Sequence, residues 1–358
     1  MPFYLMYIGS SVNQKGIHMD IRYAFWNNKG GTGKTSLAFQ AIAGYAEAHP
    51  TSRVLAVDMC PQANLSELML GGLNNRGSER LLEMQHQAPR RTIGGYFQAR
   101  LPSPYAMPTI NPADFITDVC QHNPNIPRNI RLICGDPLLE LQSNAVNTLA
   151  NNQIPGTNAW IKVIDWLNDF LALVGDSYDV VFIDCNPSFS MYTQIALSSA
   201  QRLVLPVMAD DSSRRALQNA FSLVYGLQLP SAIYAAYAFG TKLTNEGRQL
   251  PKVHLIAKNR LTQYMGAASA YSAVLTAIDS DVTHLLRSNP DIFDFADSAT
   301  GFVEVRDFQT TGVVAFAKGL PFSRLSTGRQ SVNGQRVDVK GEYLDNARRA
   351  IAGLVAKL

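Results

Sequence analysis

The residues best placed for chemistry are two lysines and three glycines crowded into one segment, Lys29-Gly30-Gly31-Thr32-Gly33-Lys34-Thr35. Glycines let a backbone turn so that consecutive N–H groups point at one anion. Lys34 is then expected to reach the β- and γ-phosphates of a nucleotide, and the Thr35 hydroxyl to coordinate Mg²⁺. The segment fits K-G-G-x-G-K-[ST] in full, whereas Asn28 replaces the first glycine of G-x-x-x-x-G-K-[ST]. Together with Ser36, it predicts a site for a nucleoside triphosphate.

The elements around this segment have the order that positions a phosphate. Ile21–Trp26 is an apolar run typical of a buried strand, and Thr35–Ala48 has a helical composition. A helix that opens directly after the glycines adds the positive end of its dipole. Further buried strands are predicted at Val54–Val57, Ile130–Cys134, Tyr178–Ile183, Leu203–Val207 and Val253–Ala257. Further helices are predicted at Trp160–Val174, from about Ser213 to Leu227, and at Tyr343–Leu358.

Strands that alternate with helices predict an α/β fold, a doubly wound, mostly parallel sheet of the P-loop NTPase type with helices on both faces. Ligands of such sheets bind beyond the carboxyl ends of the strands. Asp58, Asp184 and Asn259 each end a predicted strand, so we expect them to meet the phosphate loop there. Asp184 and Asp58 are candidate groups around Mg²⁺, with contacts through water because Mg²⁺ keeps several waters. An N-cap or a paired buried carboxylate is the alternative role for Asp184.

The motifs resemble those of the ParA/MinD family of deviant-Walker P-loop ATPases. Lys29 stands at the position of that family's signature lysine. The resemblance extends from about Met19 onward, whereas residues 71–128 and 231–320 match poorly. Val54–Ser66 resembles the family motif D-x-D-P-Q-G-N, and Tyr178–Ser188 resembles its Walker B region, Y-D-x-x-x-I-D-x-P-P-S. Two further segments also match the family, Ile130–Ala145 and Gln194–Val207.

The resemblance implies an ATPase that uses ATP and Mg²⁺ and forms a sandwich homodimer. In that family the signature lysine, here Lys29, reaches the partner's nucleotide, where added positive charge stabilises the transferring phosphoryl group. A solvated lysine is the alternative. Asn64 fits the family asparagine and would position a water or a phosphate, although an ordinary turn asparagine is also compatible. Family dimers often bind DNA non-specifically and are released by a ParB-like or cargo-linked partner. The implied role is therefore partitioning of plasmid or chromosomal DNA, or cargo positioning.

Cys60 is the main departure from the family pattern, because it replaces the second aspartate, which orients or activates the attacking water. A thiol with a pKa of about 8.5 is mostly protonated at neutral pH and is a poor acceptor. Loss of a general base commonly costs about 10²–10⁴ in rate. We expect intact binding and slow hydrolysis or almost none, unless Asp58 or a partner's group substitutes. A non-catalytic ATP-dependent switch or scaffold is thus an alternative function, whereas an ATP-dependent ligase or amidase lacks a nucleophile constellation.

The base is expected to be adenine, because Asn259-Arg260-Leu261-Thr262 lacks the aspartate of the guanine-selecting N-K-x-D motif. A net charge of +3 does not by itself identify a nucleic-acid binder, so DNA contacts require cations that converge on one face. Arg324 and Arg329 are the first choice, since they share a polar, glycine-containing segment. The full set of candidates is Arg214-Arg215, Lys252, Lys258, Arg260, Arg324, Arg329, Arg336 and Arg348-Arg349.

The chain has 358 residues, enough for one large α/β domain. Residues 1–18 are expected to be an N-terminal extension, with Met19 as a candidate start. Residues 19–325 would form the ATPase domain, with helices and loops inserted at about 71–128, and 326–358 a C-terminal tail and helix. The terminal helix is expected to pack on the core rather than on a membrane, because its alanines make a shallow apolar face. No apolar run approaches the roughly 18 residues of a membrane span, so a cytoplasmic location is expected, on the nucleoid if DNA is bound.

Overall fold

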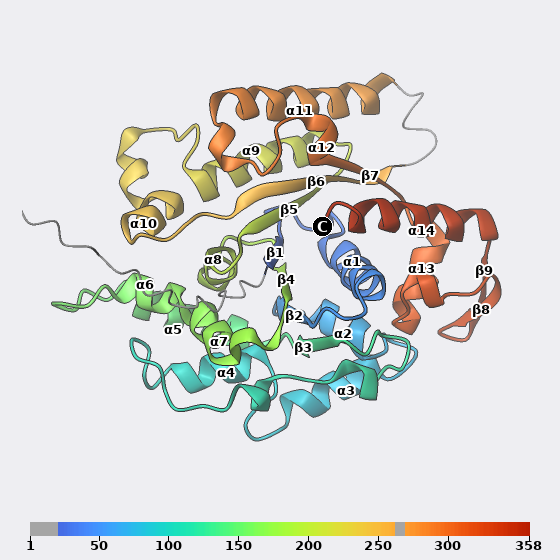
Figure 1. Cartoon of the computed structure of the whole chain (residues 1–358), viewed down its shortest axis with the longest axis horizontal. Helices are drawn as coiled ribbons and strands as arrows, with labels where there is room; N and C mark the ends of the chain where they lie inside the picture. The colour runs from blue at the N-terminus through green and yellow to red at the C-terminus, as the bar shows by residue number, and fades with distance from the viewer. Residues whose placement is uncertain (1–20, 262–268) are drawn as a thin grey trace, which may run out of the picture.

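The computed structural model describes residues 21–261 and 269–358, so the expected extension and Met19 lie outside the described residues. Within those residues, seven strands form one sheet whose neighbours are all parallel. The strands are β1 (Ile21–Phe25), β2 (Val54–Met59), β3 (Ile130–Ile133), β4 (Val180–Cys185), β5 (Arg202–Val207), β6 (Lys252–Leu261) and β7 (Phe302–Arg306). Their order across the sheet is β3-β2-β4-β1-β5-β6-β7, and helices cover both faces (Figure 1). The predicted fold class is confirmed.

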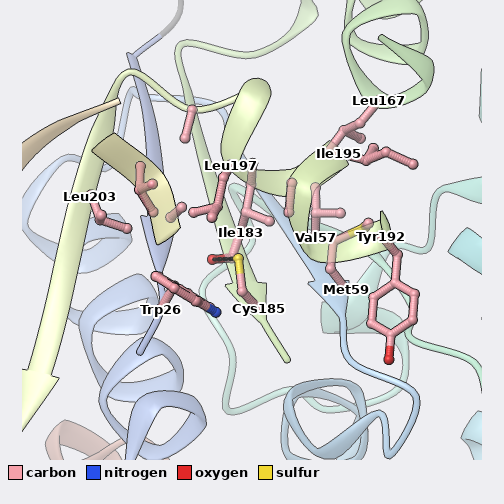
Figure 2. Close-up of a cluster of buried hydrophobic side chains, with 14 of the residues drawn as sticks. Trp26, Val57, Met59, Leu167, Ile183, Cys185, Tyr192, Ile195, Leu197 and Leu203 are labelled. Carbon is pink, nitrogen blue, oxygen red and sulfur yellow. Dashed lines mark hydrogen bonds between the residues drawn. The ribbon is translucent and has the colours of Figure 1, made fainter. Parts of the chain in front are cut away.

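Alternate side chains of the buried strands enter two separate cores, as the period of two in a strand requires. Tyr23 and Phe25 of β1 belong to one core, whereas Ala24 and the following Trp26 belong to the other. The second core also holds Val57, Ile183 and Cys185 (Figure 2). Because every strand near the centre is buried on both sides, their sequences are continuous apolar runs.

Each core is closed by its own set of helices. The Tyr23 side is covered by α1 (Lys34–Ala48), α2 (Asn64–Leu70), α3 (Gly77–Gln85), α13 (Gln309–Lys318) and α14 (Gly341–Val355). The Trp26 side is covered by α4 (Ile93–Arg100), α5 (Leu138–Ala150), α6 (Ala159–Ile164), α7 (Trp166–Val174), α8 (Met191–Ser198), α9 (Asp211–Tyr225), α10 (Phe239–Asn245) and α11 (Ser269–Ser288). A short helix, α12 (Ser298–Gly301), precedes β7. None of the described helices is long and apolar enough to cross a membrane.

Several predicted boundaries differ from the observed ones for identifiable reasons. The single helix predicted at Trp160–Val174 is wrong, because Asp165 adopts a ψ of 1° and separates α6 from α7. The helix predicted from Ser213 begins at Asp211, since the Asp210 carboxylate caps it, and it ends before Gly226, which has a φ of 68°. The region 71–128 does contain helices and loops, including two 3-10 helices, Pro112–Phe115 and Val119–Gln121.

Residues 326–358 form more regular structure than the tail and single helix that the sequence predicts. α14 buries Leu344, Ala347, Ile351 and Leu354 in the same core as α1, so this face does pack inside the protein. Before it comes an antiparallel hairpin of β8 (Gly328–Val332) and β9 (Gln335–Val339), which was not predicted. Neither was β7, an edge strand.

Candidate functional site

The phosphate loop lies between β1 and α1, at the carboxyl edge of the sheet. Gly31 and Gly33 have φ values of 76° and 82°, in the left-handed region that favours glycine. A Cβ atom on Gly33 would also lie 2.3 Å from the side-chain nitrogen of Asn259, so a larger residue would displace that side chain. Helix α1 then opens at Lys34 with no side-chain cap, which leaves its first N–H groups available to an anion.

Lys34 is the buried cation of this loop. Its Nζ donates a hydrogen bond to the Lys29 carbonyl oxygen at 2.9 Å, and burial lowers the pKa of its ammonium group while the Asp184 charge opposes that shift. A phosphate oxygen offers a stronger acceptor than a carbonyl, because the hydrogen bond is then assisted by charge on both sides. The loop therefore holds the lysine where an anion would take over its contact.

Thr35 and Asp184 form a polar pair beneath the loop. The Thr35 hydroxyl donates to Oδ2 of Asp184 at 2.7 Å, while Oδ1 of Asp184 is buried with no hydrogen-bond partner. Burial, and next the charge of Asp58, raise the pKa of the Asp184 carboxyl. A buried carboxylate oxygen without a partner is costly unless a ligand completes it. Mg²⁺ fits this pair, since it binds one or two protein oxygens and keeps its waters.

Asp58 lies next to Asp184, because the two residues are register partners in neighbouring strands. Its own oxygens are already engaged: Oδ2 accepts from the Ser66 N–H at 2.9 Å and the Ser66 hydroxyl at 2.8 Å, and Oδ1 from the Cys60 N–H at 3.1 Å. Burial raises the pKa of this carboxyl as well. Asp58 is thus brought to the expected place, where it also holds the loop from Cys60 to Ser66 in shape. In the described part of the chain, no group of three or more histidine, cysteine or carboxylate side chains is arranged to bind a metal.

Cys60 is 5% exposed, and its thiol donates to Oε1 of Gln62 at 2.8 Å. Burial, together with the carboxylates of Asp58 and Asp184, raises the pKa of the thiol to about 12. The group therefore stays protonated at neutral pH, so it has no capacity to accept a proton from water. The surroundings of Cys60 thus favour the protonated thiol, the form that is expected from the sequence to be a poor proton acceptor.

Lys29 contacts a residue that the sequence did not single out. Its Nζ lies 2.7 and 2.8 Å from the two oxygens of Asp210 and 3.1 Å from the Ser213 hydroxyl. Partial burial tends to raise the pKa of Asp210, but its hydrogen bonds with Lys29, Ser212 and Ser213 outweigh this and lower it to about 2. The only local signal of Asp210 was its position before a helix, where aspartate is a preferred cap.

Asn259 and Asn64 lie in different surroundings. Asn259, in β6, donates from Nδ2 to the Thr32 carbonyl at 2.8 Å, and its buried Oδ1 has no partner. It therefore meets the phosphate loop as expected. Asn64 is exposed at the first position of α2, with no hydrogen bond to the loop among the described residues. Ser36 is half-buried in the first turn of α1.

The cations proposed for DNA contact do not form a single surface, since they are spread over α9, β6, the hairpin and α14. Arg214 pairs with Asp281 at 2.7 Å, Lys258 with Asp279 at 2.7 Å, and Arg215 with Asp211. Arg324, one of the two arginines preferred for DNA contact, lies 3.5 Å from a Glu47 oxygen, which partly neutralises its charge. Arg348 donates to the backbone carbonyls of Phe322 and Leu325.

Comparisons with known proteins agree with this arrangement. The family model AAA_31, described as an AAA domain, matches residues 22–229, which run from β1 to just past α9. A candidate replication protein A of Rhizobium rhizogenes is 28% identical over 186 residues, which make up 51% of this chain and 38% of that protein. A second such protein, from Sinorhizobium fredii (strain NBRC 101917 / NGR234), is 30% identical over 187 residues, 51% of this chain and 38% of that protein. The chain thus matches well under half the length of these relatives.

Two solved structures share the fold across nearly the whole chain. Apo McdA of Cyanothece gives a TM-score of 0.59 at 14% identity, covering 95% of this chain and 99% of that chain. A candidate plasmid partition protein of Borrelia burgdorferi B31, bound to AMPPNP, gives a TM-score of 0.54 at 14% identity, covering 95% of this chain and 100% of that chain. At such identities the likeness establishes the architecture alone.

Proposed function

Since this chain belongs to the AAA_31 family of AAA domains, the ParA/MinD type of P-loop fold, we propose that it is a ParA-like ATP-binding protein that acts in DNA partitioning or cargo positioning. The observation that carries the proposal is the set of unsatisfied polar groups around the phosphate loop. The first N–H groups of α1 and the partnerless Oδ1 of Asp184 lie at this loop, and a triphosphate with Mg²⁺ would satisfy them. Lys34 would exchange its bond to the Lys29 carbonyl for one to a phosphate oxygen. The solved neighbours with ATP and AMPPNP support the same ligand class.

A further buried atom without a hydrogen-bond partner, Oδ1 of Asn259, favours ATP over GTP. One of the two Nδ2–H bonds of this residue is used by the Thr32 carbonyl, which orients the amide and leaves Oδ1 as its buried acceptor without a partner. Adenine presents an exocyclic amino group, which donates, whereas guanine presents a carbonyl oxygen at the same ring position. A buried acceptor that faces another acceptor remains unpaired, at a cost of about 1–3 kcal/mol.

The rest of the proposal follows the family. ATP with Mg²⁺ would assemble a homodimer in which Lys29 leaves Asp210 and reaches the nucleotide of the partner subunit. The dimer would bind DNA without sequence preference and be released by a ParB-like or cargo-linked partner, in the cytoplasm and on the nucleoid. Mg²⁺ would neutralise charge on the phosphates, while Lys34 and the loop amides orient them.

A second candidate function is an ATP-dependent dimerisation switch with negligible turnover. It is favoured by the protonated Cys60 thiol, which donates to Oε1 of Gln62 at 2.8 Å and lies 3.9 Å from Oδ1 of Asn186. In the switch, ATP binding would favour dimerisation, and hydrolysis would not set the lifetime of the dimer. The two functions share the nucleotide site and differ in whether ATP is consumed.

The deciding experiment is a titration of purified protein with ATP and Mg²⁺, in which calorimetry reports affinity, light scattering reports mass and phosphate release reports turnover. We expect Mg²⁺-dependent binding, an increase to dimer mass, and discrimination against GTP. Lys29→Ala is the matched control, since a monomer should still bind ATP through Lys34 while the dimer is lost. Absence of measurable affinity for ATP with Mg²⁺ would overturn the proposal, and binding with no change of mass would remove the dimer from it.

A further inference from the structure

Positive charge is concentrated in one short stretch near the C-terminus. Residues 318–340 hold five basic side chains, Lys318, Arg324, Arg329, Arg336 and Lys340, against one acidic side chain, Asp338. The whole chain has 31 basic and 28 acidic residues, so the remaining 335 residues have 26 and 27 and a net charge of −1. This stretch, with +4, therefore carries more than the entire net charge of the protein.

The centre of the stretch is the hairpin of β8 and β9, which has one buried and one exposed face. Val332 and Val339 are 9% and 1% exposed and belong to the core that α13 and α14 cover. Lys318 of α13 donates to the side chain of Gln330 at 2.6 Å, which fixes the ribbon to that helix. The two strands join through Asn333-Gly334, whose φ values of 49° and 79° are typical of the tight turn that matches strand twist. The hairpin is thus held rigidly beside α13 (Figure 1).

The exposed face carries Arg329, Ser331, Arg336 and Asp338. Arg329 is in register with Asp338, and Ser331 with Arg336, so the two arginines are diagonal neighbours, about 7–8 Å apart. Neither arginine makes an ion pair within the described residues. This separates them from Arg214, Arg215 and Lys258, whose charges are neutralised by carboxylates.

We propose that this exposed ribbon face, which carries Arg329, Ser331, Arg336 and Asp338 and ends in the Asn333-Gly334 turn, is the duplex DNA contact of the protein, with the two arginines as its phosphate-binding groups. The inference rests on the proposed function and assigns a surface to its DNA partner. A two-stranded ribbon fits the major groove, which is about 12 Å wide. Arginine with short polar side chains is the set that contacts phosphate oxygens and fixes a protein on DNA without reading sequence.

Two other polyanionic partners fit the ribbon less well. An anionic membrane is bound by basic faces that also insert apolar anchors, and none of the large hydrophobic side chains exposed in the described residues lies in the hairpin. An acidic protein would need only charge, whereas the ribbon also presents the uncharged hydroxyl of Ser331 on a two-stranded scaffold. Duplex DNA uses both features.

Dimerisation driven by ATP would also control DNA binding through this ribbon. One subunit offers two unpaired arginines, which is few for a contact that depends on released counterions. A dimer offers two ribbons to one duplex, so the second contact becomes intramolecular and the apparent affinity rises steeply. DNA binding would then follow dimerisation without any rearrangement of the ribbon itself.

The test compares Arg329→Ala/Arg336→Ala with Arg215→Ala/Arg287→Ala, a control that removes the same charge from exposed positions on α9 and α11. Binding of the full chain to a fluorescent duplex of arbitrary sequence is measured with ATP and Mg²⁺ over a salt series. Each lost phosphate contact lowers the slope of log K against log salt by about 0.9. We therefore expect the ribbon variant to lose about 2 from the slope per subunit and at least tenfold in affinity, while the control stays near wild type.

Each outcome decides the inference. Equal losses in the two variants would show that only total charge matters and would overturn it, as would a loss confined to the α9 and α11 control. A ribbon variant that binds DNA normally but loses binding to vesicles of anionic lipid would assign the surface to membranes. Thermal melting and ATP-dependent mass are measured for every variant, with Arg329→Gln/Arg336→Gln as a milder second change. If the wild type fails to bind ATP or to dimerise, the proposed function fails. If the wild type does both and the ribbon variant still binds DNA with wild-type affinity, this inference alone fails.

Discussion

The phosphate loop and the loop from Cys60 to Ser66 lie at the same edge of the sheet but satisfy their polar groups in opposite ways. Around the first, Oδ1 of Asp184, Oγ1 of Thr32 and Oδ1 of Asn259 are buried without partners. In the second, the Asp58 oxygens accept bonds from Ser66 and Cys60, and the Cys60 thiol donates to Gln62. The first region is incomplete without a ligand, whereas the second is complete by itself.

This difference separates binding from turnover. Unpaired buried groups favour a ligand that completes them, because they are costly in its absence. In the second loop the buried groups are already paired, and its protonated Cys60 thiol offers an attacking water no general base. The two regions therefore predict a protein in which nucleotide affinity is high and hydrolysis is limited by one residue.

The largest effect is expected from Lys34→Ala. Charge-assisted hydrogen bonds contribute about 1.5–3 kcal/mol each, and an ammonium group has three N–H donors, so we expect Lys34 to bond to both the β- and the γ-phosphate. Affinity for ATP with Mg²⁺ should fall by about 100-fold or more in calorimetry. Lys318→Ala is the control, because that lysine bonds to Gln330 away from the site. Retention of wild-type affinity by Lys34→Ala would mean that the loop does not hold the phosphates.

Cys60→Asp should give the next largest effect, a rise in ATP turnover on the order of 10–100-fold. A carboxylate restores the acceptor that the protonated thiol lacks, and general-base catalysis commonly contributes about 10²–10⁴. We expect a gain at or below the low end of this range, because the new carboxylate would lie near the like charges of Asp58 and Asp184, which oppose its ionisation. Cys60→Asn has the same shape without the charge and should remain slow. Substantial turnover by the wild type, or equal rates for both variants, would contradict the contrast.

The contrast between the two loops was only partly predictable. Contiguous motifs identified the phosphate loop, Asp58, Asp184 and Asn259 as neighbours, since strand ends in a parallel sheet meet at one edge. Asp210 was missed, because its contact with Lys29 joins positions 181 residues apart. No local pattern encodes such a pair.

Edge elements were also missed, for a related reason. β7 alternates buried Val303 and Val305 with exposed Glu304 and Arg306, so it lacks the continuous apolar run of a central strand. The hairpin has mostly polar strands, and only its Asn333-Gly334 turn signalled it. Sequence patterns thus predicted the buried centre of the main sheet better than its edge strand β7 or the separate β8-β9 hairpin, which carries the proposed DNA surface.

A pH effect on stability should expose the incomplete site directly. Burial and the charge of Asp58 raise the pKa of Asp184 in the folded protein. The stabilisation that results from this shift is therefore complete below the ordinary carboxyl pKa of about 4. It is lost as the pH rises through the pKa of the folded protein. A tenfold difference in proton affinity between the folded and unfolded protein corresponds to about 1.4 kcal/mol. Urea unfolding in a chelator should therefore show stability falling from about pH 4 toward neutrality. Asp184→Asn should flatten that slope, and Mg²⁺ with ATP should stabilise the wild type more as pH rises. A slope that survives in the variant would assign it to other groups.

The smallest effect is expected from Asp210→Asn, which weakens the ion pair that holds Lys29 within its own subunit. If Lys29 must leave Asp210 to reach a nucleotide, this pair opposes dimerisation, and partly exposed pairs of this kind contribute about 0–1 kcal/mol. The ATP concentration at half-maximal dimer mass should thus fall by up to about fivefold. Asparagine remains a good N-cap for α9, so the helix start is preserved. Asp211→Asn removes the same charge one residue away, from the pair with Arg215, and should leave the midpoint unchanged. A higher midpoint in Asp210→Asn alone would mean that Asp210 positions Lys29 for its role instead of restraining it, and the phosphate loop would then depend on a contact already complete before the ligand binds.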